Sequence, residues 1–151
     1  MPRWRDVTLV NRTGVILVDS DEIGIKDGSG RYFSPYDYVT HDILAATPNS
    51  FIWTCIEGVW QIAGVAEAHT VAGGASAAVQ VVVCPGSVAI ASGTAQLTAT
   101  LDLTVTAPAK SFGTLIATPT QIFRGDSVGL SFSGTLTGLV GMLTVQLRRV
   151  G

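Results

Sequence analysis

The sequence predicts an all-β protein whose C-terminal part is an antiparallel, jelly-roll-like β-sandwich. Three observations favour this class: apolar and polar residues alternate with a period of two, turn residues recur about every 8 to 12 positions, and no long segment has helical periodicity. Only 13% of the residues are charged, against about 25% in typical soluble domains, and 47% are hydrophobic. This composition indicates a surface that is covered in part by other chains, with a merely apolar β domain as the alternative.

The 151 residues suit one domain, or one domain with an appendage. We expect residues 1–58 to form an extended arm and a small β-hairpin region, and residues 59–151 to form the sandwich and the contacts between copies. The opening MPRWRDVTLV lacks helical periodicity, which favours an extended arm. Asp27-Gly28-Ser29-Gly30, between Ile25 and Tyr32, predicts a hairpin.

The joint between the two parts carries three aromatic residues, Phe51, Trp53 and Trp60. Aromatic side chains supply much of the area of cores and interfaces alike, and we assign all three to the core, with a binding platform as the alternative. Cys55 and Cys84 have neither a CxxC nor a Cys/His spacing, so no zinc site is expected. We expect buried free thiols, with a disulfide as the alternative.

Several segments in the second part predict strands. SAAVQVVVCPG places Val79, Val81 and Val83 on one face and ends at a Pro-Gly turn. SVAIAS, residues 87–92, predicts the next short strand.

The clearest alternation is LTATLDLTVTAP, residues 97–108, with an apolar phase and a threonine-rich phase. A helix would spread these apolar positions around its whole circumference, so the pattern predicts a long strand with one buried face. The apolar phase consists of Leu97, Ala99, Leu101, Leu103 and Val105. Two later strands follow the same rule, with Val128, Leu130 and Phe132 inward in one and Leu143, Val145 and Leu147 inward in the other.

Arg124-Gly125-Asp126 has the letters of a cell-adhesion signal. It directly precedes the Val128 strand, where a glycine with positive φ and a capping aspartate would make a turn. We therefore interpret it as a turn. An Asp126 side chain that bonds to nearby backbone would exclude a presented ligand.

No motif supports an enzyme: Walker and GxGxxG patterns are absent from the sequence, and the GxSxG match at Gly125–Gly129 leads into a predicted strand and not into the helix that a nucleophile elbow requires. Asp19, Asp21, Glu22 and Asp27 lie close together but do not fit the EF-hand spacing, so we expect a solvated acidic turn, no metal and no cofactor.

Glu67 and His69 lie two apart on one predicted strand and share a face, which suits a surface pair. The formal net charge is −2 without a Lys/Arg cluster, which argues against nucleic-acid binding. We also expect no membrane span and no signal peptide, because no apolar run approaches about 18 residues and no basic-then-apolar leader opens the chain.

From about residue 60 to residue 151 the chain resembles the β-sandwich domain of tailed-bacteriophage virion accessory proteins. That group includes capsid decoration (cement) proteins, head fibres and spike-base proteins. The motifs that carry the resemblance are the Val-rich strand, the turn near Cys84-Pro85, the Ser92-Gly93-Thr94 step, the Leu/Ala alternation, Gly125-Asp126, Gly134-Thr135-Leu136-Thr137 and the final Leu147-Arg148-Arg149.

The resemblance implies a structural protein on the outer surface of the phage head, made in the host cytoplasm, which stabilises the mature capsid by clamping junctions of the major capsid protein. The candidate capsid-binding residues are Arg3, Trp4, Arg5, Tyr32, Tyr36 and Tyr38. The candidate contacts between copies are Thr98, Thr100, Thr104 and Thr106, with a homotrimer favoured and a dimer next. The alternative function is a fibre or spike module that binds a host-surface glycan, although the expected loops near Gly73 and Gly134 carry no aromatic residue.

Overall fold

The computed structural model describes residues 15–19, 22–26, 32–33 and 36–151, with side chains from residue 36 onward. Contacts divide the chain into two compact units, Met1–Asp37 and Tyr38–Gly151. The boundary predicted after residue 58 lies inside the second unit, because residues 38–58 group by contacts with the sandwich.

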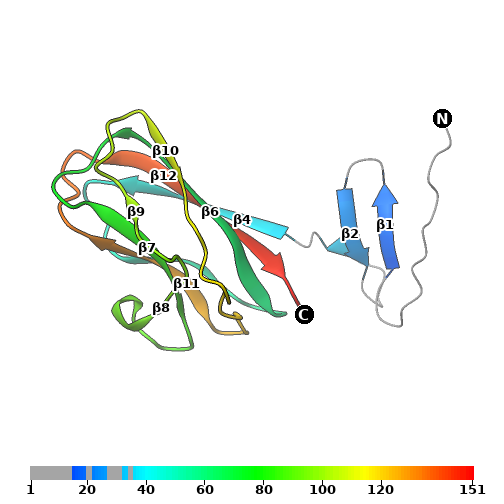
Figure 1. The fold of residues 1–151 in the computed structure, drawn as a ribbon. Helices are drawn as coiled ribbons and strands as arrows, with labels where there is room; N and C mark the ends of the chain where they lie inside the picture. Colours follow the sequence, from blue (N-terminus) through cyan, green and yellow to red (C-terminus); the bar gives the residue numbers. More distant parts are fainter. Residues whose placement is uncertain (1–14, 20–21, 27–31, 34–35) are drawn as a thin grey trace, which may run out of the picture. The chain divides into compact units, whose positions relative to one another are not determined.

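The first unit contains a three-stranded antiparallel sheet in the order β1-β2-β3 (Figure 1). Its strands are β1 (Val15–Asp19), β2 (Glu22–Lys26) and β3 (Tyr32–Phe33). β2 pairs with β3 through Ile25↔Phe33 and Lys26↔Tyr32, so residues 27–31 connect two antiparallel strands as the hairpin signal predicts. The predicted arm and the acidic positions Asp21 and Asp27 lie outside the described residues.

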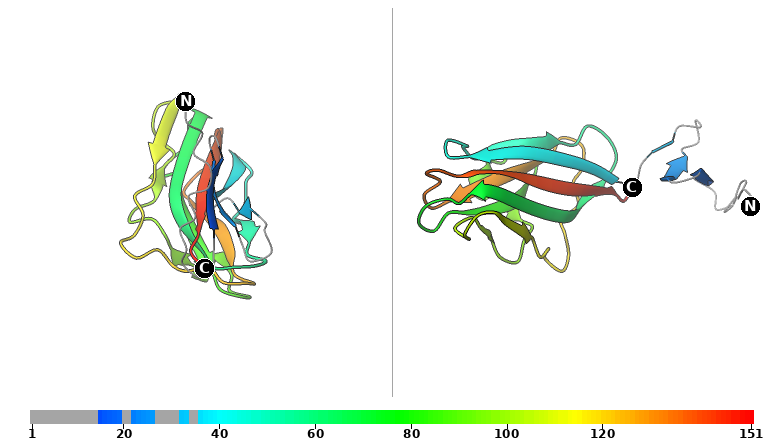
Figure 2. Two further views of the ribbon diagram at one scale, coloured as in Figure 1. Left: turned by 90° about the vertical axis from the view of Figure 1, so that its right-hand side faces the viewer. Right: turned by 90° about the horizontal axis from the view of Figure 1, so that it is seen from above.

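The second unit is a sandwich of two antiparallel sheets, which confirms the predicted all-β, antiparallel sandwich (Figures 1 and 2). One sheet has the order β10-β6-β12-β4, and the other has the order β5-β11-β7-β8, with β9 also paired to β7. The strands are β4 (Tyr36–Leu44), β5 (Ser50–Thr54), β6 (Trp60–Val71), β7 (Ala78–Cys84), β8 (Thr94–Ala95), β9 (Leu101–Asp102), β10 (Ala109–Phe112), β11 (Ser127–Ser133) and β12 (Val140–Arg149).

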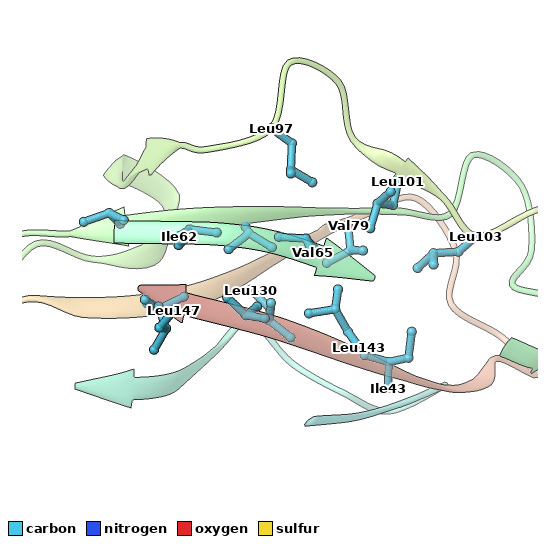
Figure 3. Packing of buried hydrophobic residues seen from close by; sticks show 14 of the residues in the cluster. Ile43, Ile62, Val65, Val79, Leu97, Leu101, Leu103, Leu130, Leu143 and Leu147 are labelled. Carbon is cyan, nitrogen blue, oxygen red and sulfur yellow. The ribbon is translucent and has the colours of Figure 1, made fainter. Parts of the chain in front are cut away.

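The core lies between the two sheets, where the inward-facing side chains of one sheet pack against those of the other (Figure 3). The inward positions predicted for three strands are fully buried: Val79, Val81, Val83, Val128, Leu130, Leu143, Val145 and Leu147. Phe132, the remaining predicted inward residue, is half-buried and packs against this cluster. Burying one such Leu or Val side chain contributes about 1.5–3 kcal/mol, so this alternation supplies much of the stability.

Two predicted strands are wrong. Residues 87–92 follow a turn at Pro85, with Val88 N donating to Pro85 O, and end in a 3₁₀ helix, η1 (Ile90–Ser92). The segment 97–108 is regular only in β9, because β7 offers it just two partners, Ala78 and Val79. Its apolar phase is accordingly split: Leu97, Leu101 and Leu103 are buried, whereas Ala99 and Val105 are exposed.

Candidate interaction surfaces

The outer face of the β10-β6-β12-β4 sheet is largely uncharged, with small side chains on β6 and larger ones on the other strands. Lys110 lies opposite Ala68, and Ala68 lies opposite Met142, so these three form a row across the sheet. The next row joins Phe112, Ala66 and Thr144 in the same way. Because side chains alternate between the faces of a strand, and Leu143 between Met142 and Thr144 is buried, both rows point away from the core.

β4 extends both rows. Thr40 Oγ1 lies 3.1 Å from Thr144 Oγ1, and Gln146 Nε2 donates to the Tyr38 hydroxyl at 2.8 Å. From Tyr38 to Thr40 the number on β4 rises by two, while that of the partner on β12 falls by two, from Gln146 to Thr144. The two strands are therefore antiparallel, and the next outward residue of β4, Asp42, lies opposite Met142. Each row therefore spans four strands, and one of them is Lys110–Ala68–Met142–Asp42.

An open groove runs over this face, and we call it the outer groove. Its lining includes Asp42, Ala68, Thr70, Lys110, Val140 and Met142. Val140 and Met142 are 43% and 45% exposed, and Phe112, in the neighbouring row on β10, is 81% exposed. This is an apolar surface with a cation at one edge and a carboxylate at the other.

Of the six candidate capsid-binding residues, only Tyr36 and Tyr38 have described side chains. Both belong to β4 and are exposed, at 41% and 62%. Tyr32 lies in β3. Arg3, Trp4 and Arg5 lie outside the described residues, and the attachment role of all six stays a prediction.

The four threonines proposed for contacts between copies are all exposed, but they do not form one strand face. Thr98 Oγ1 donates to Thr114 O at 3.2 Å, and Thr104 Oγ1 donates to Asp102 Oδ1 at 2.7 Å. These two hydroxyls serve their own chain, and the role of the set in association stays a prediction.

Arg124-Gly125-Asp126 forms the predicted turn. Gly125 has φ +92, and the Asp126 carboxylate accepts hydrogen bonds from Gly86 N (3.1 Å) and Phe123 N (2.9 Å). The carboxylate is thus engaged by nearby backbone, which excludes its presentation as an adhesion ligand.

Glu67 and His69 are not a surface pair: they are 2% and 1% exposed, deep between the sheets. The surface interpretation failed because the strand buries the phase of Val65, and Glu67 and His69 continue that phase. His69 Nδ1 lies 2.6 Å from Glu67 Oε1, and His69 Nε2 lies 2.8 Å from Val105 O.

This geometry fixes the protons of the pair. The Val105 carbonyl only accepts, so Nε2 carries a hydrogen, and one further proton is shared between Nδ1 and Glu67 Oε1. Burial by itself would lower the pKa of His69, but the hydrogen bonds to Val105 and Glu67 and the nearby Asp102 outweigh it and raise that pKa above its ordinary value. The pair holds Val105 to β6 and is structural in character.

The aromatic joint is partly buried. Trp53 and Trp60 pack edge to face with ring centroids 5.8 Å apart and lie against the core, whereas Phe51 is 53% exposed, so its assignment to the core is wrong. Cys55 and Cys84 are buried free thiols, as expected, and burial raises the pKa of both.

Among the residues that the structure describes, no group of three or more His, Cys, Asp or Glu side chains could hold a metal ion. Within the same ranges, no helix is long and apolar enough to cross a membrane.

No protein family and no curated protein sequence matches this chain. A chain from the acidic stable capsid structure of Helicobacter pylori bacteriophage KHP30 aligns with a TM-score of 0.50 and 13% identity, over 76% of this chain and 88% of that one. A chain from the capsid asymmetric unit of cyanophage Pam1 aligns with a TM-score of 0.47 and 11% identity, over 76% and 84%. At 13% identity the first likeness shows a shared fold alone.

Proposed function

We propose that this chain is a structural protein of a bacteriophage virion that decorates the mature capsid and stabilises it. The observation that carries the proposal is the sandwich fold, shared at a TM-score of 0.50 with a chain of the KHP30 capsid structure. The low charge of 13% and the broad apolar outer sheet face support it, because both suit a protein that works between other subunits.

The mechanism is clamping by binding. A protein that binds the assembled lattice and not its separated subunits stabilises the assembly by mass action. We assign attachment to the first part of the chain, with Trp4 as an apolar anchor, Arg3 and Arg5 against acidic capsid rims, and Tyr32, Tyr36 and Tyr38 as further contacts. The exposure of Tyr36 and Tyr38 is consistent with this assignment.

The test uses heads of the phage that encodes this chain, prepared without it. Purified protein is added back, and the bound copies and the temperature of thermal rupture are measured. The proposal expects saturable binding and a higher rupture temperature, both weakened when Trp4 is replaced by Ala. Heads that bind no protein and rupture at an unchanged temperature would contradict it, and a dozen or fewer copies per native particle would indicate a tail or spike part.

A further inference from the structure

We propose that the outer face of the β10-β6-β12-β4 sheet is a self-complementary interface, which pairs two copies of this chain across a two-fold axis parallel to the strands. The proposal concerns the free protein and does not rest on binding to a capsid. It also assigns association to a different surface from Thr98, Thr100, Thr104 and Thr106.

The row Lys110–Ala68–Met142–Asp42 carries the argument. Its members belong to β10, β6, β12 and β4, in the order of the strands across the sheet. A two-fold axis above the sheet, along the strands and between β6 and β12, exchanges the two ends of the row. Lys110 of one copy then faces Asp42 of the other, and the reverse contact forms by symmetry.

The centre of the row is complementary in size. The same rotation places Met142 of one copy over Ala68 of the other, so a long, flexible side chain enters the outer groove where the facing side chain is a single methyl. Two such contacts form per dimer. Because Met142 is 45% exposed in the isolated chain, each contact removes apolar surface from water.

The neighbouring row agrees with this arrangement. Phe112, which is 81% exposed on the edge strand, comes to lie over Thr40 of the second copy, and Ala66 lies over Thr144. Thus no charge meets a like charge, and no large side chain meets another, in either row. Strands of two stacked sheets stay within about 30° of each other, and a two-fold axis parallel to the strands satisfies this condition.

The face is large enough for a specific contact. β6 has 12 residues, which span about 40 Å, and four strands about 4.8 Å apart cover about 19 Å. Because β10, β12 and β4 are shorter than β6, the face covers about 550 Å², so two copies bury up to about 1,100 Å², which clears the roughly 1,000 Å² expected of a specific interface.

The decisive test is a charge exchange at the two ends of the row. Asp42 and Lys110 are both exposed, so Asp42→Lys and Lys110→Asp leave the core intact. Each single variant places like charges opposite each other twice per dimer. We therefore expect the dimer dissociation constant, measured by analytical ultracentrifugation, to rise at least about tenfold. The double variant restores opposite charges and should recover the dimer, while Arg124→Asp, a matched charge change in the Asp126 turn, should leave it unchanged.

A second measurement needs no variant. Lys110 is the one lysine in residues 38–151, and it stands three strands, or about 14 Å, from Asp42 of its own chain. A zero-length carbodiimide cross-link between Lys110 and Asp42 should therefore form between copies, as mixed ¹⁴N/¹⁵N samples would reveal. A wild-type protein that stays monomeric at high concentration, an oligomer that neither single variant weakens, or a double variant that does not recover would each overturn the proposal.

Discussion

The β6–β12 ladder and the connection from Gly93 to Asp126 reach the same core by different means. The ladder runs from Trp60↔Arg149 to Val71↔Val140 with two register shifts, and its inward phase is almost wholly buried. The connection contains only the short strands β8, β9 and β10. Backbone pairing and alternation hold the first region, whereas the second region combines short ladders and scattered backbone hydrogen bonds with polar side chains that bond to its backbone.

Gln96 is the principal polar anchor of the connection. It is fully buried, its Oε1 accepts from Thr120 N at 2.9 Å, and its Nε2 donates to Thr94 O at 2.9 Å and to Thr120 Oγ1 at 2.8 Å. Gln80 from β7 likewise brackets Leu97, accepting from its N–H and donating to its carbonyl. The His69–Glu67 pair holds Val105. A backbone without ladder partners needs such side-chain partners when it is buried.

The largest effect is expected in the ladder. Leu147→Ala removes a fully buried side chain and should lower the free energy of unfolding by about 2–5 kcal/mol, measured by urea denaturation. The neighbouring Arg148 points outward, so Arg148→Ala should change that free energy by less than about 0.5 kcal/mol. Equal effects of the two changes would mean that the inward phase of β12 is misassigned.

The next effect separates the two regions. Gln96→Leu keeps the side-chain size but strips the hydrogen-bond partners of Thr94 and Thr120, and should lower the free energy of unfolding by about 2–3 kcal/mol. Hydrogen exchange should accelerate in residues 94–120 before it accelerates in β6 and β12. Gln121→Leu, at an exposed position nearby, is the control. Uniform acceleration across both regions would contradict the proposed division.

The pH dependence of stability tests the role of the His69–Glu67 pair, which holds Val105. The pKa of His69 is raised in the folded state, so the pair contributes fully below about pH 6.5 and its contribution is lost as the pH rises through the raised value. Loss of the shared proton leaves the Nδ1 lone pair facing the Glu67 carboxylate. Urea midpoints should therefore fall as the pH rises above about 6.5.

Glu67→Gln sharpens the same prediction. An amide can donate to neutral Nδ1 while Nε2 still donates to Val105, so this variant should flatten the fall in urea midpoints. An equally steep fall in the variant would show that another group is responsible.

The smallest effect concerns the turn that closes the connection. Asp126→Ala removes two hydrogen bonds to backbone N–H groups, at Gly86 and Phe123, and should cost about 1 kcal/mol in urea denaturation. Arg124→Ala, in the same tripeptide but exposed, should cost nothing measurable. A larger loss of stability in Arg124→Ala than in Asp126→Ala would contradict the role of Asp126 in stabilising the turn.

The same division explains what could be predicted from the sequence. The inward positions of β7, β11 and β12 follow from alternation, because each strand has ladder partners along its length. The pattern of residues 97–108 looks equally regular, yet its partners are decided by distant residues such as Gln80 and His69, which local periodicity does not reveal.

The candidate surface was harder to predict than the core. The burial of Glu67 and His69 could have been found by extending the phase of Val65 along β6. The row Lys110–Ala68–Met142–Asp42 could not, because it depends on the strand order β10-β6-β12-β4, in which no two neighbours are consecutive in the chain. Side chains far apart in sequence become one surface only when that order is known.

Imaging of the native phage particle by cryo-electron microscopy, with and without the gene for this chain, tests the central claim most directly. Our account predicts hundreds of copies of the sandwich on the outside of the head, with paired sandwiches touching through their β10-β6-β12-β4 sheets. Heads with identical density in both samples would contradict the proposed function. Sandwiches present on the head but meeting through another face would contradict the proposed interface alone.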